Sequence, residues 1–288
     1  MNSLKPRRDV VGSEIDRVKD RSASRQLVEK LFQDAHRVFV VHYSCESFYE
    51  NATGASLRVT SIAIRNLKSA QTKSWSLHAT AELLGMLESM PTNLDNIEKR
   101  MLDGYFEFLR THADCQFLHW NMRDNNYGFY AVEHRHRALG GNPYELQDAN
   151  KHDLARILVS LYGHRYAPHS DSAGRRGRIM GLAELNNITD KDALTGEQEA
   201  AAYVAGDFLT MHRSTLRKLD MFANFFDRAH QKTLKTTSTW MDRVGVHPVA
   251  VIEWAKSHPL ITGLLLLGSV LGAVTSFGKF WTWVNTVL

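Results

Sequence analysis

The chain has 288 residues, of which 43% are hydrophobic and 23% are charged. This composition suits one sizeable globular domain with an additional segment, and it excludes a largely disordered chain. The formal net charge is only +4, so any affinity for nucleic acid must come from local clusters of basic side chains.

The N-terminal segment, residues 1–30, is polar and basic, and it lacks the apolar stretch that a secretory signal peptide needs. Cys45 and Cys115 each stand beside an apolar run that is typical of a buried strand. Reduced core thiols are therefore favoured over a disulfide, and we expect the main domain to be cytoplasmic.

The other end of the chain has a different composition. Residues 259–278 carry no charged side chain, and about 20 apolar residues suffice for a helix to cross a bilayer. We expect residues 259–288 to form a single transmembrane segment with an interfacial aromatic tail that contains Phe280, Trp281 and Trp283. A buried core helix is the weaker alternative. The basic residues before the span indicate that the N-terminal domain lies on the cytoplasmic side. We expect the chain to be located in the bacterial inner (plasma) membrane.

Within this segment, Gly268 and Gly272 form a G-x-x-x-G pattern. Small residues four apart let two helices approach closely in a bilayer. The pattern predicts homo-oligomerisation through the transmembrane helix, with the lipid bilayer as the other partner of this segment.

The first half of the chain shows strand patterns. Residues 38–42 combine β-branched and aromatic side chains with no helical period, which predicts a strand. Residues 57–67 and 72–78 alternate between apolar and polar side chains, and turn-rich stretches connect them, so an antiparallel meander is expected. A fourth strand is predicted at residues 115–121.

Helical patterns follow the meander and the fourth strand. The predicted helices cover residues 80–90, 93–113, 125–139 and 148–163, and residues 163–178 read as a loop. Thr195 and Gln198 form a capping box that opens a long helix, 196–234. A juxtamembrane helix, 236–258, is expected to break at His247 and Pro248.

This order of elements resembles the RNase H-like fold, an α/β fold with a mixed sheet flanked by helices. Within that fold it is similar to the DEDD family of 3′ to 5′ exonucleases. The resemblance covers the domain at residues 31–235. His119 stands five residues before Asp124, as in the family motif after the fourth strand, and Tyr203 and Asp207 match the Y-x-x-x-D of its late helix.

The resemblance implies that carboxylates converge on a pair of Mg²⁺ ions and that a tyrosine orients the attacking water. Glu46, Asp124 and Asp207 would then be the metal ligands and Tyr203 the fourth catalytic residue. The first motif departs from the family, because Ser44 stands where either register needs an acid. We therefore expect no cofactor, or Mg²⁺ if the site is catalytic.

The loop at residues 163–178 is rich in arginine. Against one acid, Asp171, it carries four arginines that are candidates for binding nucleic acid: Arg165, Arg175, Arg176 and Arg178. Guanidinium groups suit phosphates, and Tyr166 between them is a candidate for stacking on a base. A solvated loop without a ligand is the alternative.

The sequence contains no phosphate-binding G-x-x-x-x-G-K-[ST], no G-x-S-x-G and no zinc motif. The favoured hypothesis is a membrane-anchored effector whose inactive RNase H-like domain recognises nucleic acid or a nucleoprotein complex. By analogy of architecture, such chains resemble effectors of bacterial anti-phage and toxin systems. The alternatives are an active exonuclease tethered to the membrane and an anchored scaffold with neither activity.

Overall fold

The computed structural model describes residues 8–46, 56–123, 127–239 and 242. The chain divides into two compact units. One consists of residues 21–242, and the other combines residues 1–20 with 243–288, of which only residues 8–20 are described. The predicted transmembrane segment 259–288, with Gly268 and Gly272, lies outside the described residues. Within the described ranges, no helix has the length and apolar character needed to cross a membrane.

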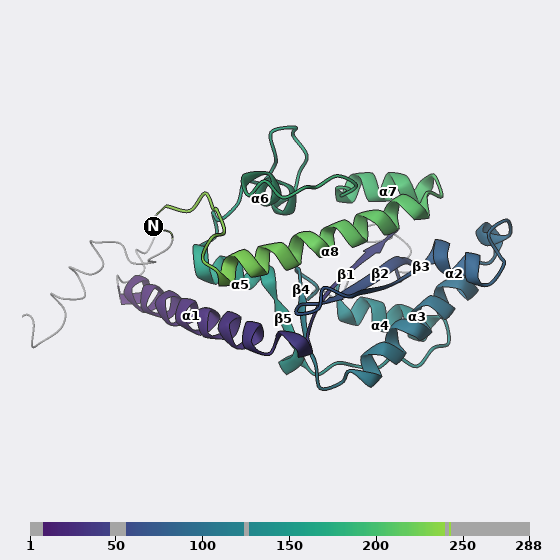
Figure 1. The fold of residues 1–288 in the computed structure, drawn as a ribbon, viewed down its shortest axis with the longest axis horizontal. Coiled ribbons are helices and arrows are strands. Elements are labelled where there is room, and N and C mark those ends of the chain that lie inside the picture. The colour runs from purple at the N-terminus through teal and green to yellow at the C-terminus, as the bar shows by residue number, and fades with distance from the viewer. Residues whose placement is uncertain (1–7, 47–55, 124–126, 240–241, 243–288) are drawn as a thin grey trace, which may run out of the picture. The chain divides into compact units, whose positions relative to one another are not determined.

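Figure 1 shows the helices and strands along the chain. The elements are α1 (Arg8–Gln33), β1 (Val38–Cys45), β2 (Val59–Asn66), β3 (Thr72–Ser76), α2 (Leu77–Leu83), α3 (Leu94–Thr111), β4 (Gln116–His119), α4 (Phe129–Ala138), β5 (Lys151–Asp153), α5 (Leu154–Tyr162), α6 (Arg178–Leu185), α7 (Gly196–Val204) and α8 (Phe208–His230).

The strands form one mixed sheet in the order β3-β2-β1-β4-β5. β1 pairs antiparallel with β2, and β2 antiparallel with β3, which confirms the predicted meander. β4 lies parallel to β1, and β5 parallel to β4. The predicted α/β class, with a mixed sheet flanked by helices, is therefore confirmed.

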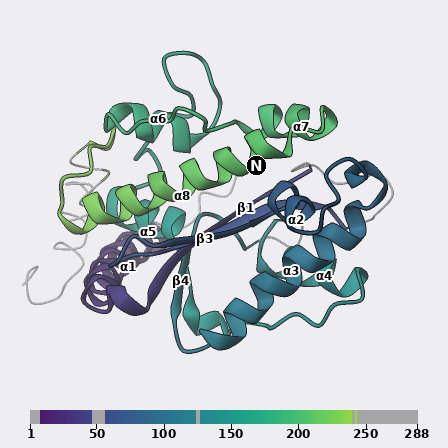
Figure 2. The same cartoon turned by 45° about the vertical axis from the view of Figure 1, so that its right-hand side comes forward.

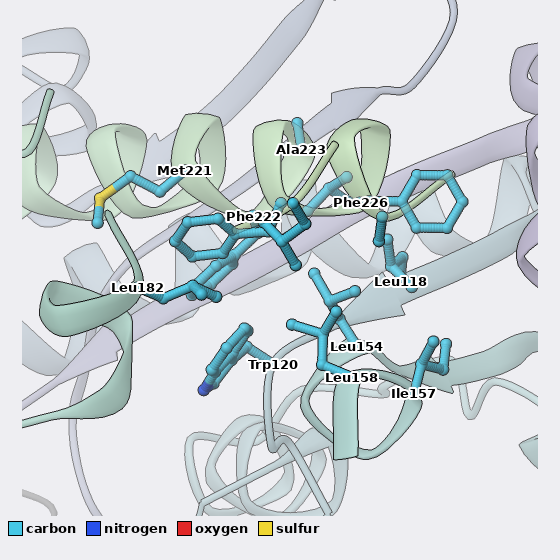
Figure 3. Packing of buried hydrophobic residues seen from close by; sticks show 14 of the residues in the cluster. Leu118, Trp120, Leu154, Ile157, Leu158, Leu182, Met221, Phe222, Ala223 and Phe226 are labelled. Atoms are coloured by element: carbon cyan, nitrogen blue, oxygen red, sulfur yellow. The ribbon is translucent and has the colours of Figure 1, made fainter. Parts of the chain in front are cut away.

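Helices cover both faces of the sheet (Figures 1 and 2). Alternate residues of β1 point to opposite faces: Val40 joins a core with α5, α6 and α8, whereas Val41 joins a core with α2, α3 and α4. Figure 3 shows the first core, where Phe222 and Phe226 of α8 lie over Leu118 of β4 and the leucines of α5. α8 thus lies directly over the strands that end at the candidate site.

The helical period predicted at residues 93–113 is confirmed by α3. Its buried side chains follow the i, i+4, i+7 spacing and end in the second core: Ile97, Met101, Leu102, Tyr105 and Leu109. The capping box is also confirmed, because Thr195 and Gln198 exchange both hydrogen bonds at the start of α7. Cys45 and Cys115 are buried thiols, as expected.

The long helix predicted at 196–234 is wrong. α7 ends at Val204, and α8 begins at Phe208 after a turn in which Gly206 adopts a φ of +71°. Glycine takes this left-handed conformation at little cost, so the chain can leave one helix and enter the next. In the sequence, apolar residues continue at helical spacing across the turn, although Val204 on its N-terminal side is exposed, which is why the pattern does not reveal the break.

The predicted helix at 148–163 begins too early. Residues 151–153 form the edge strand β5, and the Asp153 side chain accepts a hydrogen bond from the Ala155 backbone N–H as the cap of α5. Other boundaries shift by a few residues: β1 runs on to Cys45, α2 begins at Leu77, and the loop at 163–178 ends where α6 begins.

Candidate functional site at one edge of the sheet

The carboxyl ends of β1, β4 and β5 meet at one edge of the sheet, because these three strands are parallel. Ligands of open α/β sheets usually bind outside this edge. Ser44 lies near the end of β1, and His119 and Asp153 are the last residues of β4 and β5. This edge of the sheet is therefore the expected place of a functional site.

A network of buried polar side chains lies between the end of β1 and the helices α7 and α8. The Ser44 hydroxyl donates to Glu199 Oε1 at 3.0 Å and lies 2.8 Å from the Thr215 hydroxyl. Ser214 also donates to Glu199 Oε1, at 2.8 Å. Lys218 Nζ lies 2.7 Å from the same oxygen, and its side chain is only 6% exposed. The place of an acid at the end of β1 is therefore taken by a hydroxyl that hydrogen bonds to a buried ion pair.

His42 lies two residues earlier on the same face of β1 and is also buried. Burial, with a smaller contribution from the positive charge of Lys218, lowers the pKa of His42 well below its ordinary value. Its ring packs edge-on against Phe222. His42 is therefore a neutral side chain of the core and does not supply an acid on β1.

Glu46 and Tyr203, two of the predicted catalytic residues, lie close together. Burial raises the pKa of Tyr203, and the neighbouring Glu46 carboxylate raises it further, while a hydrogen bond from Arg58 acts in the opposite direction. Arg58 is also paired with Asp95 and with the fully buried Glu98, at 2.7 Å each. Glu46 thus shares its surroundings with a tyrosine and an arginine.

The other two predicted catalytic residues are Asp124 and Asp207. Asp124 lies outside the described residues. Asp207 caps α8, where its Oδ1 accepts a hydrogen bond from the Thr210 backbone N–H at 3.0 Å. Hydrogen bonds from Thr210 hold the pKa of Asp207 below its usual value. Across the described ranges, no group of three His, Cys, Asp or Glu residues has the arrangement of a metal site.

At the end of β4, polar groups hold the loop that follows the strand. The Met122 backbone N–H donates to His119 Nδ1 at 3.1 Å, and Asp153 Oδ1 accepts from the Asn121 N–H, also at 3.1 Å. Arg123 forms an ion pair with Asp153. Burial lowers the pKa of His119 to about 4, against the opposing charge of Asp153. His119 and Asn121 therefore fix the junction between strand and loop.

The four arginines of the candidate nucleic-acid loop have different environments. Arg175 forms ion pairs with Asp171 and Asp190, so its charge is balanced. Arg165 and Arg176 are exposed. Arg178 lies over the Tyr166 ring, 5.4 Å from its centroid, and contacts His169. The loop therefore presents fewer unbalanced charges than its sequence indicates.

Arg178 faces a pocket of about 660 Å³, which we call the basic pocket. It lies between the loop after β4, the first turns of α5 and the loop that leads to α6. Its described lining contains no acid and consists of Trp120, Asn121, Arg123, Ala155, Arg156, Val159, Ser160, His164, Tyr166, His169 and Arg178. The basic pocket is thus a cationic concave surface beside the carboxyl ends of β4 and β5.

Sequence reasoning missed the residues that define both features. Glu199 and Lys218 are nineteen residues apart on two helices, and neither stands in a family motif. Arg123 and Arg156 come from segments separate from the arginine-rich loop. A lysine within the apolar stripe of α8 was the one available signal, because buried lysines require a partner.

No protein-family model, curated protein or solved structure gave a significant match to the chain. The α/β architecture rests on the strand pairing alone. The likeness to RNase H-like exonucleases rests on residues of this sequence and on the order of its elements.

Proposed function

We propose that the chain is a membrane-anchored effector, of the kind used in bacterial anti-phage defence or as a toxin. In this proposal its RNase H-like domain recognises nucleic acid without cleaving it. The order of elements supports the fold assignment: an antiparallel meander is followed by helices, a parallel fourth strand and a late helix over the sheet.

The proposed absence of cleavage rests on the buried Lys218 ammonium group beside Glu199. A two-metal site needs carboxylates whose oxygens are available to Mg²⁺. Here Glu199 Oε1 already accepts hydrogen bonds from Ser44, Ser214 and Lys218, whereas Glu199 Oε2 is buried and has no hydrogen-bond partner among the described residues. A fixed positive charge at this position also repels a divalent cation. The Lys218 charge, and the lack of any group of three His, Cys, Asp or Glu residues among the described residues that could hold a metal ion, therefore argue against a two-metal centre.

Recognition of nucleic acid is supported by the basic pocket. Arginine, lysine and histidine side chains neutralise phosphates, and guanidinium groups make paired hydrogen bonds to them. The pocket lies beside the ends of β4 and β5, where an open α/β sheet usually binds its ligand.

The chain that follows α8 connects this pocket to the C-terminal region. The Thr237 backbone N–H donates to the Tyr166 carbonyl at 3.2 Å, and Asn186 and Lys235 exchange two hydrogen bonds. The pocket loop thus holds the segment that leads towards residues 259–288. This connection supports an effector in which a ligand in the domain alters the proposed transmembrane segment.

Recognition is tested with the full chain and a single-stranded oligonucleotide in a gel-shift assay at increasing salt. We expect an affinity that falls steeply with salt, because phosphate contacts release counterions. An affinity that does not depend on salt would refute recognition through the basic pocket.

The membrane role is tested by expressing the full chain and a variant that lacks residues 259–288 while membrane potential is followed with a dye. We expect depolarisation only with the full chain. Equal toxicity of the truncated variant would refute a role in the membrane.

One observation favours the alternative, a tethered metal-dependent exonuclease. Glu46 and Tyr203 lie together, as a carboxylate ligand and a water-orienting tyrosine would. Digestion of a single-stranded oligonucleotide that requires Mg²⁺ and is abolished by Asp124→Asn would establish this alternative.

A further inference from the structure

The aromatic rings of the basic pocket are already occupied by protein groups. Trp120 stacks on Phe222, with ring centroids 5.1 Å apart and an interplanar angle of 11°. Tyr166 is only 1% exposed and lies beneath the guanidinium group of Arg178. Stacking on a base requires an open aromatic face. The pocket therefore offers charge and hydrogen-bond donors, and the stacking predicted for Tyr166 does not fit its burial.

The charges in the pocket are unevenly balanced. Arg123 is neutralised by Asp153. Arg156 and Arg178 form no ion pair with any acid among the described residues, and Arg156 is exposed. Two guanidinium charges thus remain uncompensated in a concave site whose described lining contains no carboxylate.

Two of the three arginines, Arg123 and Arg178, also contact other protein groups, whereas Arg156 is exposed. Arg178 is fixed between the Tyr166 ring and His169, and Arg123 donates to the Asn121 side chain at 2.7 Å. Ser160 and His164 add a hydroxyl and an imidazole to the same lining. Preorganised donors lose little conformational entropy on binding, so they favour a compact and highly charged anion.

We infer that the basic pocket binds a phosphate monoester through Arg156 and Arg178. A monoester carries a charge of about −1.5 to −2 at neutral pH and three acceptor oxygens, whereas each phosphodiester of a strand carries a single charge. Two uncompensated guanidinium groups match the monoester. Its source is either the terminal phosphate of a nucleic-acid strand, which rests on the proposed function, or a free nucleoside monophosphate.

The test measures binding to the full chain of four ligands: a 5′-phosphorylated oligonucleotide, its 5′-hydroxyl counterpart, adenosine 5′-monophosphate and adenosine. We expect the phosphorylated member of at least one pair to bind about tenfold more tightly, because charge-assisted hydrogen bonds are worth that much. Arg156→Gln and Arg178→Gln should each remove this advantage. The matched control Arg176→Gln, exposed and outside the described lining, should retain it.

Arg178→Gln also removes the contact with Tyr166 and could prevent folding. In that case Arg156→Gln decides the result, because Arg156 is exposed. Equal affinity within both pairs, or an advantage that survives Arg156→Gln, would overturn the inference. If the two oligonucleotides bind equally and adenosine monophosphate binds no better than adenosine, the inference fails while recognition of nucleic acid stands. If neither oligonucleotide binds but adenosine monophosphate does, the proposed function fails while the phosphate site stands.

Discussion

Lys218 Nζ lies 2.7 Å from Glu199 Oε1, and both side chains are buried between α7, α8 and the end of β1. Removing one partner of a buried ion pair leaves an uncompensated charge and typically costs about 3–5 kcal/mol. We therefore expect Lys218→Met to lower the free energy of unfolding by about this amount, measured by chemical denaturation.

The matched control is the double variant Lys218→Met with Glu199→Gln, in which no charge remains and the amide still accepts from Ser44 and Ser214. We expect it to be more stable than Lys218→Met alone, and the coupling appears in a double-mutant cycle. A loss below about 1 kcal/mol in Lys218→Met would show that this pair does not hold the site closed.

His119 predicts a dependence of stability on pH. The Met122 N–H donates to Nδ1, so the proton of the neutral ring sits on Nε2 and a second proton would break this hydrogen bond. The pKa of His119 is lowered from 6.5 to about 4. Between these values the unfolded chain binds more protons, so the free energy of unfolding falls as pH falls through this window, by up to about 3 kcal/mol from this residue.

Denaturation at pH 7 and pH 4.5 measures this effect. His119→Asn keeps an acceptor near the position of Nδ1 and should show a smaller fall than the wild type. His164→Asn, at an exposed position, is the control and should behave as the wild type does. The same fall in wild type and His119→Asn would contradict the assignment.

Asp207 is expected to act as a helix cap. Its Oδ1 accepts from the Thr210 N–H at 3.0 Å, and loss of such a cap costs about 1 kcal/mol. Asp207→Ala should lower the free energy of unfolding by this amount, whereas Asp207→Asn, which retains an acceptor, should stay near the wild-type value. If both variants are equally destabilised, capping is not the role of this side chain.

Arg175 is expected to stabilise its loop rather than bind nucleic acid, because it is paired with Asp171 and Asp190. Arg175→Gln should speed limited proteolysis within residues 163–177 and leave the affinity for an oligonucleotide unchanged. Arg156→Gln should lower the affinity for an oligonucleotide and leave the rate of proteolysis unchanged. A loss of affinity in Arg175→Gln without faster proteolysis would refute this division of roles.

The sequence predicted those helices and strands that can be recognised from a short stretch of neighbouring residues. The strand at Val38 was found from a run of β-branched and aromatic residues, and the helix carrying Ile97 and Met101 from an apolar face that repeats along the chain. The turn at Gly206 was missed, because apolar residues recur at helical spacing on both sides of it. β5 was missed because three residues are too few to show alternation.

The candidate site was predicted less completely than the fold. Glu46 and Tyr203 were named from the sequence, and the structure brings them together. Glu199 and Lys218 were not, since their contact depends on how α7 packs against α8. Arg156 and Arg178 meet in one pocket only because the sheet places α5 beside the loop that leads to α6, and no spacing rule records such a meeting.

Recognition without cleavage is tested most directly by incubating the full chain with a 5′-labelled single-stranded oligonucleotide and Mg²⁺, and following both complex formation and strand length over time. We predict that the strand is bound and stays at full length, for the wild type and for Asp124→Asn alike. Progressive shortening from the 3′ end that requires Mg²⁺ and disappears in Asp124→Asn would contradict the account.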